Sequence, residues 1–174
     1  MVNHLCVGEL QTNCWIIPLP KDGSQKPEPS GSASQKPGDC MVVDPGGHGG
    51  LILARLEKLR LRPRYIVLTH AHFDHIAALP DLAAAFPDAD IAIHPAEMAK
   101  LGPQSLEIHR RDFNFAGASA FIDALWKPGM QWQPLPEASV LLQEGDTLGP
   151  FRILHLPGHS PGSIGLYWEE EKIL

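Results

Sequence analysis

The chain has 174 residues, of which 44% are hydrophobic and 20% are charged. This length and balance are typical of one folded domain with its own core. The formal net charge of −6 argues against a nucleic-acid-binding protein, which would need clustered lysines and arginines. No apolar run reaches the roughly 20 residues of a membrane span, and residues 1–6 lack the pattern of a signal peptide. We therefore expect a protein that binds neither nucleic acid nor membrane.

The predicted elements alternate between strands and helices along the chain. From Leu51, apolar residues at helical spacing predict a helix that ends before Pro63. The basic residues of segment 58–64 are interpreted as the end of this helix, where positive charge suits the helix dipole. The remaining pattern predicts strands at 14–19, 40–44, 65–68, 91–93, 139–142, 151–156 and 163–168, a helical turn from Asp74, and helices at 80–86 and 95–101. This order predicts an α/β layered domain that spans residues 1–174.

Two segments lack a regular period. Residues 21–39 are rich in proline, glycine and serine and contain the tetrapeptide Ser-Gln-Lys-Pro twice, so we expect a flexible loop inside the domain. Residues 102–136 are interpreted as a loop-and-helix excursion over one face of the sheet. The odd number of cysteines, without C-x-x-C spacing, predicts buried free thiols in a reducing compartment, and we expect the cytoplasm. The cysteines are Cys6, Cys14 and Cys40.

The segment most informative about function is Thr69-His70-Ala71-His72-Phe73-Asp74-His75, which directly follows a predicted strand. Imidazole and carboxylate are ligands for a borderline divalent ion such as zinc. His70 and His72 are two residues apart, so in an extended segment both point to the same side and can bind one ion. Asp74 and His75 fall at the turn into a helix and suit a second ion nearby. The alternative is that Asp74 is only a helix N-cap and His75 a first-turn residue.

A second segment, residues 156–163, offers His159 from a tight turn. A catalytic zinc needs three protein ligands and an open position for water, and His70, His72 and His159 supply that number. The turn Asp44-Pro45-Gly46-Gly47 either simply ends a strand or also lines the site. The other histidines stand singly and are interpreted as structural; they are His4, His48, His94, His109 and His155.

Residues 42–47, 69–75 and 156–163 together resemble the metallo-β-lactamase superfamily, whose signature is H-x-H-x-D-H after a strand, and within it glyoxalase II (hydroxyacylglutathione hydrolase). The resemblance implies an αββα sandwich, incomplete here in its second half. It implies that His70, His72 and His159 bind a first metal ion. Asp74 and His75 would belong to a second ion, and Asp74 would also be catalytic by orienting the attacking water.

The activity implied by the resemblance is hydrolysis of a small-molecule thioester, with metal-bound hydroxide as the nucleophile. The implied cofactor is zinc, as one or two ions, with iron or manganese as alternatives. Alternative functions are a persulfide dioxygenase-like oxidoreductase with one iron, a lactonase or β-lactamase, and an inactive or partner-binding fold. The oligomeric state is left open.

The family also uses a bridging aspartate in an F-x-G-D turn and a last histidine, and this sequence contains neither of them. Residues 172–174 resemble the opening of the strand that precedes that turn. We therefore expect a fragment of a longer gene product, with a naturally short chain and a crippled second site as the alternative. As an isolated chain it is expected to be weakly stable, because its sheet edge is open, and to bind at most one metal ion.

Overall fold

Two β-sheets pack face to face in the computed structural model, which describes residues 2–20, 37–115, 117, 135–172 and 174. The larger sheet has the strand order β1-β2-β3-β4-β5-β6, and the smaller one has the order β7-β8-β9. The strands are β1 (Asn3–Val7), β2 (Thr12–Pro18), β3 (Gly38–Val43), β4 (Leu61–Val67), β5 (Asp90–Ile93), β6 (Val140–Leu141), β7 (Thr147–Leu148), β8 (Phe151–His155) and β9 (Ile164–Tyr167). The helices are α1 (Gly49–Leu59), α2 (Phe73–Ile76), α3 (Leu79–Ala85), the 3₁₀ helix η1 (Pro95–Lys100) and α4 (Ser105–Phe115).

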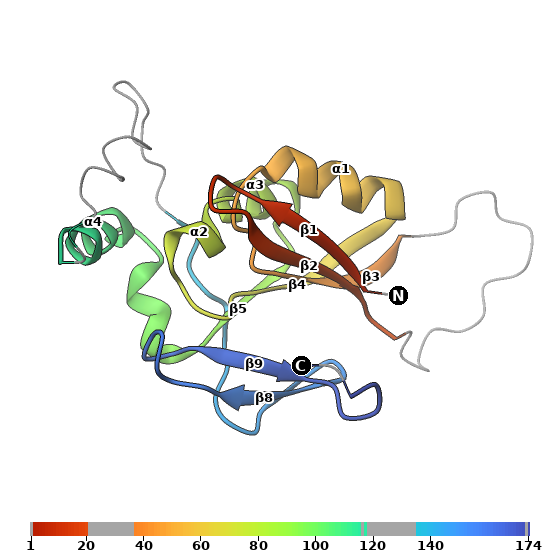
Figure 1. Cartoon of the computed structure of the whole chain (residues 1–174). Helices are drawn as coiled ribbons and strands as arrows, with labels where there is room; N and C mark the ends of the chain where they lie inside the picture. Colours follow the sequence, from red (N-terminus) through yellow and green to blue (C-terminus); the bar gives the residue numbers. More distant parts are fainter. Residues whose placement is uncertain (1, 21–36, 116, 118–134, 173) are drawn as a thin grey trace, which may run out of the picture.

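The larger sheet is antiparallel from β1 to β3 and parallel from β3 to β6. Parallel neighbours need crossover connections, and the helices supply them: α1 joins β3 to β4, while α2 and α3 join β4 to β5. Figure 1 shows α1 and α3 on one side of this sheet and the β8–β9 hairpin on the other. The described residues thus form helix, sheet and sheet layers, which confirms the predicted α/β class. Within the described residues, no helix covers the outer face of the small sheet, where an αββα sandwich would have its second helical layer.

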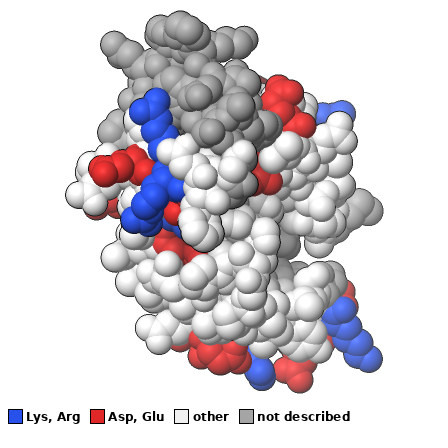
Figure 2. Space-filling view, turned by 60° about the vertical axis from the view of Figure 1, so that its left-hand side comes forward, with Lys and Arg blue, Asp and Glu red and all other residues white. Residues whose placement is uncertain are grey.

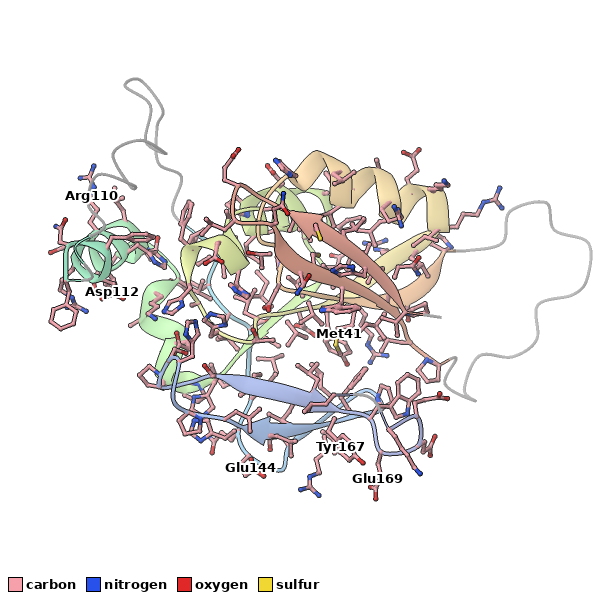
Figure 3. All side chains as sticks on the ribbon, viewed as in Figure 1. Met41, Arg110, Asp112, Glu144, Tyr167 and Glu169 are labelled. Carbon is pink, nitrogen blue, oxygen red and sulfur yellow. The ribbon has the colours of Figure 1, made fainter. Side chains whose placement is uncertain are left out.

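Strand β3 illustrates how the larger sheet separates two cores. Cys40 and Val42 pack on the helix side with Ile52 and Leu56 of α1, because successive side chains of a strand point to opposite faces. Met41 lies on the other face, between the two sheets (Figure 3). There it joins the buried residues Val43, Phe151, Ile153 and Leu166. Burial on both faces explains the continuous apolar run in this strand.

The basic segment 58–64 is only in part a helix end, which confirms the interpretation from the sequence for Lys58 and Arg60 and corrects it for residues 61–64. Helix α1 stops at Leu59, Arg60 adopts a left-handed conformation (φ 53°), and Leu61 already begins β4. Pro63 therefore lies inside a strand. The pairing with β3 shifts there, from Cys40 opposite Pro63 to Met41 opposite Tyr65. Such a bulge tolerates a proline, which has no N–H to donate to the ladder.

Several boundaries differ from the sequence-based expectations. Strand β1 was not predicted, and Gly38 and Asp39, the end of the expected loop, lie in β3; residues 21–36 are outside the described residues. The helix expected at 95–101 is a 3₁₀ helix. Lys172 lies in a turn and not in a strand. The expectation of buried thiols is correct for Cys14 and Cys40 and wrong for Cys6, which is exposed.

Charged side chains on the outer surface are mixed in sign. Figure 2 shows lysine and arginine side chains gathered beside acidic ones, with a broad uncharged area below them. Around α4, Lys100 lies 3.9 Å from Asp112 and Arg111 lies 3.7 Å from the same carboxylate. Arg110 and Asp112 both extend from this helix (Figure 3). Within the described part of the chain, no helix has the length and apolar character to cross a bilayer.

Candidate metal centre

Strands β3, β4 and β5 are parallel, so they end at the same edge of the sheet. The polar segments that follow these three strands therefore meet at this edge. Asp44 follows β3, residues 69–75 follow β4, and η1 follows β5. The turn between β8 and β9 carries His159 to the same edge. It is tied there by the Ile164 N–H, which donates to the Thr69 carbonyl oxygen over 2.9 Å.

His70, His72 and His159 converge at this edge, as the sequence predicted. One nitrogen of each ring lies within 4.8 Å of the others, and within the described ranges this is the only set of three or more potential metal ligands so close together. His72 Nδ1 and His159 Nε2 are 2.9 Å apart. His70 Nε2 is buried and has no hydrogen-bond partner. A buried nitrogen without a partner needs an explanation, and a metal ion bound by three imidazoles provides one.

The protonation state of His70 also suits a metal ligand. Burial, followed by the neighbouring histidines, lowers its pKa to about 3, and burial also lowers the pKa of His72. The Thr69 hydroxyl donates to Asp44 Oδ2 over 2.6 Å, so His70 Nδ1, 3.1 Å from that hydroxyl oxygen, must be the donor to it. The lone pair of the neutral ring is then on Nε2, which faces the other two histidines.

Asp74 and His75 present a second pair of donor atoms. His75 Nε2 lies 3.5 Å from Asp74 Oδ2, which also accepts a hydrogen bond from the Thr12 hydroxyl over 2.9 Å. Burial alone would lower the pKa of His75, but its hydrogen bond to Asp44 and the negative charge there raise it. Asp74 lies inside α2 and the N-cap is His72, so the interpretation of Asp74 as a helix cap is wrong.

Asp44 does more than end β3, so the second of the two interpretations holds. Its carboxylate accepts hydrogen bonds from the Thr69 N–H at 2.8 Å, the Thr69 hydroxyl and His75 Nδ1 at 2.9 Å. The glycine-rich turn after it packs tightly, since a Cβ on Gly46 would lie 2.0 Å from the Asp74 carbonyl oxygen. Only glycine leaves room for that approach.

Two residues near the site were missed by the sequence analysis. Thr12 begins β2 and bonds Asp74, but nothing in the sequence pairs these residues, which are 62 positions apart. Glu97 is fully buried in η1 and accepts a hydrogen bond from the Ala71 N–H over 3.3 Å. The only available signal was a lone acidic residue soon after a predicted buried strand.

The histidines interpreted as structural lie outside the three-histidine set. The His48 Nδ1 accepts from the Gly8 N–H at 3.1 Å, and His109 Nε2 lies 3.1 Å from the Lys100 carbonyl oxygen. His94 and His155 stack with ring centroids 4.3 Å apart. His4 lies 2.7 Å from the Asn13 side-chain oxygen. Each one thus has a partner within the protein, as a structural role requires.

Comparisons with known proteins agree with this arrangement. Residues 35–174 match the family model described as the metallo-beta-lactamase superfamily. The chain is 34% identical over 140 residues to the probable metallo-hydrolase YqgX of Bacillus subtilis, covering 78% of this chain and 58% of that protein. It is 32% identical over 136 residues to the hydroxyacylglutathione hydrolase GloC of Haemophilus influenzae, with the same two coverages of 78% and 58%.

Among solved structures, TTHA1623 in a di-iron-bound form superposes with a TM-score of 0.66 at 30% sequence identity. The match covers 97% of this chain and 68% of that one. The chain spans 58% of the length of each of the two curated relatives, YqgX and GloC.

Proposed function

Because this chain belongs to the metallo-β-lactamase superfamily of metal-dependent hydrolases, we propose that it hydrolyses thioesters of the hydroxyacylglutathione type. We assign His70, His72 and His159 as the ligands of the principal metal ion. The observation that carries this proposal is the buried, unpartnered Nε2 of His70 beside two further imidazole nitrogens. Zinc is the proposed ion, because three neutral imidazoles with an open fourth position suit it.

A divalent ion held by His70, His72 and His159 would lower the pKa of a bound water and would stabilise negative charge on the carbonyl oxygen of the substrate. The protein supplies the remaining functions. Asp74 is proposed to orient the attacking water and to accept its proton on the carboxylate. The Thr12 hydroxyl holds that carboxylate in place by donating a hydrogen bond to Oδ2. The pair Asp74 and His75 is further proposed to contribute ligands to a second ion.

The thioester class is supported by the hydroxyacylglutathione hydrolase of H. influenzae, which is 32% identical over 136 residues. Iron is the competing metal, because the structural neighbour TTHA1623 was solved with two iron ions. A reducing compartment such as the cytoplasm is proposed because Cys6, Cys14 and Cys40 are all free thiols.

The test is release of free thiol from a hydroxyacylglutathione by the purified chain, measured after chelation and after addition of zinc. We expect zinc-dependent hydrolysis that falls at least about 100-fold in His72→Ala, because the metal site loses a ligand. His4→Ala, which changes an exposed histidine away from the site, serves as the matched control and should leave the rate unchanged. Hydrolysis that survives both chelation and His72→Ala would refute the proposal. Oxygen consumption with a glutathione persulfide by the iron-loaded protein, without thioester hydrolysis, would support the oxidoreductase alternative instead.

A further inference from the structure

Glu97 is a charged side chain with no exposed surface. It lies in η1, directly after the buried strand β5. Burying a carboxylate is strongly unfavourable unless hydrogen bonds and an opposite charge replace the lost water. Hydrogen bonds must therefore compensate the buried charge of Glu97. They come from both of the segments that carry the three histidines.

The two carboxylate oxygens contact different segments. Glu97 Oε1 accepts from the Gly162 N–H over 2.9 Å, and Oε2 accepts from the Ala71 N–H over 3.3 Å. Ala71 lies between His70 and His72, and Gly162 lies three residues after His159. One side chain thus connects two ligand-bearing segments that are otherwise far apart in the sequence.

A lysine in η1 compensates the buried charge, and a serine beside His159 adds a further donor. Lys100 Nζ lies 3.0 Å from Oε2, and the Ser160 hydroxyl, next to His159, also bonds the carboxylate. Burial would raise the pKa of Glu97, but the hydrogen bonds from Gly162, Ser160 and Lys100 lower it, so the group is ionised. Hydrogen bonds to an ionised acceptor are stronger and more directional than neutral ones.

The segment that carries His159 also packs closely against this side chain. A Cβ placed on Gly162 would lie 2.7 Å from Glu97 Cγ and 2.9 Å from His94 Nδ1. The segment therefore has no room to move toward η1, while the hydrogen bond from the Gly162 N–H holds it against moving away. Since both carboxylate oxygens already accept from N–H groups, and the close set of potential ligands leaves Glu97 out, it is not suited to bind the ion itself.

We propose that Glu97 is a positioning residue: it fixes the separation between the segment of His70 and His72 and the segment of His159, and thereby sets the metal affinity. This inference rests on the proposed metal site. A metal bound by three imidazoles needs their nitrogens at fixed separations, and groups that orient the ligands commonly change metal affinity by about 10–100-fold. Glu97 would act on all three ligands through the backbone and not through their rings.

The test is the zinc affinity of Glu97→Gln, measured by competition with a chromophoric chelator. Glutamine keeps the size of the side chain but offers one oxygen, so one of the two N–H donors would face an amide N–H. We expect zinc to bind about 10–100-fold more weakly per folded molecule. Glu107→Gln, which neutralises an exposed carboxylate on α4, is the matched control and should bind like the wild type.

A double-mutant comparison separates positioning from a general loss of stability. If Glu97 acts through the separation of the two segments, Glu97→Gln should weaken zinc binding much less in a His159→Ala background than in the wild type. Melting in a chelator shows whether each variant is folded. The inference would be overturned if Glu97→Gln lowered the zinc affinity by the same factor in both backgrounds. It would also be overturned if folded Glu97→Gln bound zinc as tightly as the wild type.

Wild-type protein that binds no zinc would refute the proposed metal site, and this result is distinct from failure of Glu97→Gln alone. If Glu97→Gln does not fold, Ser160→Ala replaces it, because that change removes a single donor to the carboxylate beside His159. A several-fold loss of zinc affinity is then expected, and wild-type affinity would overturn the inference.

Discussion

His75 Nδ1 lies 2.9 Å from Oδ2 of Asp44, and the same oxygen accepts the Thr69 hydroxyl at 2.6 Å. One carboxylate at the end of β3 therefore orients His75 directly and His70 through Thr69. This arrangement leaves His70 Nε2 without a hydrogen-bond partner in the protein and directs His75 Nε2 toward Asp74 Oδ2, 3.5 Å away. Carboxylates that hold metal-binding histidines in this way raise ligand basicity and fix the tautomer.

Asp44→Asn is expected to weaken zinc binding by about 10–100-fold, because the carboxylate uses both oxygens as acceptors and the amide has only one. Its NH2 group would have to face either the Thr69 N–H or the Thr69 hydroxyl and His75 Nδ1. Asparagine is chosen because Asp44 has φ 52°, and asparagine tolerates this left-handed conformation. The measurement is chelator competition, with Asp39→Asn on the exposed part of the same strand as control. Equal zinc affinities of the two variants would show that Asp44 does not orient the ligands.

The metal-free protein should lose stability as the pH falls from 7 toward 5. Burial lowers the pKa of His70 from 6.5 to about 3 in the folded state, so between these values the unfolded chain binds a proton that the folded chain does not. The lowered pKa of His72 acts in the same direction, and the raised pKa of His75 opposes it. Melting temperatures in a chelator should therefore fall with pH, and fall less in His70→Gln, which cannot titrate. Identical pH dependence of the two proteins would contradict this explanation.

Thiol alkylation of the native protein is expected at Cys6 alone. Cys14 and Cys40 are buried, and burial, followed by the charges of Asp44 and Asp39 respectively, raises the pKa of each thiol to about 12. A thiol with so high a pKa provides almost no reactive thiolate at neutral pH. Mass spectrometry after brief treatment with iodoacetamide checks this, with the unfolded protein as the control for full labelling. Native labelling of Cys14 or Cys40 at a rate similar to that of Cys6 would contradict the burial of these strands.

Helix α1 offers a matched pair for testing the core on the helix side of the sheet. Ile52 is completely buried, whereas the adjacent Leu51 is 46% exposed. Ile52→Ala should lower the free energy of unfolding by about 2–5 kcal/mol, because it leaves a cavity against β3 and β4. Leu51→Ala should change it by no more than roughly 0.5 kcal/mol. Chemical denaturation of both variants measures the difference, and similar values would show that α1 does not cover the sheet.

The sequence predicted most of what depends on local pattern. The apolar runs predicted β3, β4 and β5, and the spacing of His70 and His72 placed both rings on one side of an extended segment. His159 was added because a catalytic zinc needs a third ligand, and the structure brings it to 2.9 Å from His72. These predictions succeeded because strand periodicity and ligand chemistry are visible in a single segment.

The misses came from features that only the tertiary structure decides. The helix ends before Pro63 as predicted, but the sequence did not show that β4 begins at Leu61 and accommodates Pro63 at a bulge opposite β3. Strand β1 is only five residues long, with Leu5 and Val7 buried, and it forms because it pairs with β2. Thr12 and Glu97 contact the site from positions that are distant in the sequence, so no spacing rule could have connected them to the histidines.

Zinc binding by equilibrium dialysis tests the central claim most directly. The three-histidine site predicts that the wild-type chain retains a tightly bound zinc ion after dialysis against buffer. His159→Ala should lose most of this zinc, because it removes the ligand that the β8–β9 turn supplies. His109→Gln, a change of a buried histidine outside the set, should retain it. A folded His159→Ala variant that holds zinc as tightly as the wild type, or a wild-type chain that holds none, would contradict the account.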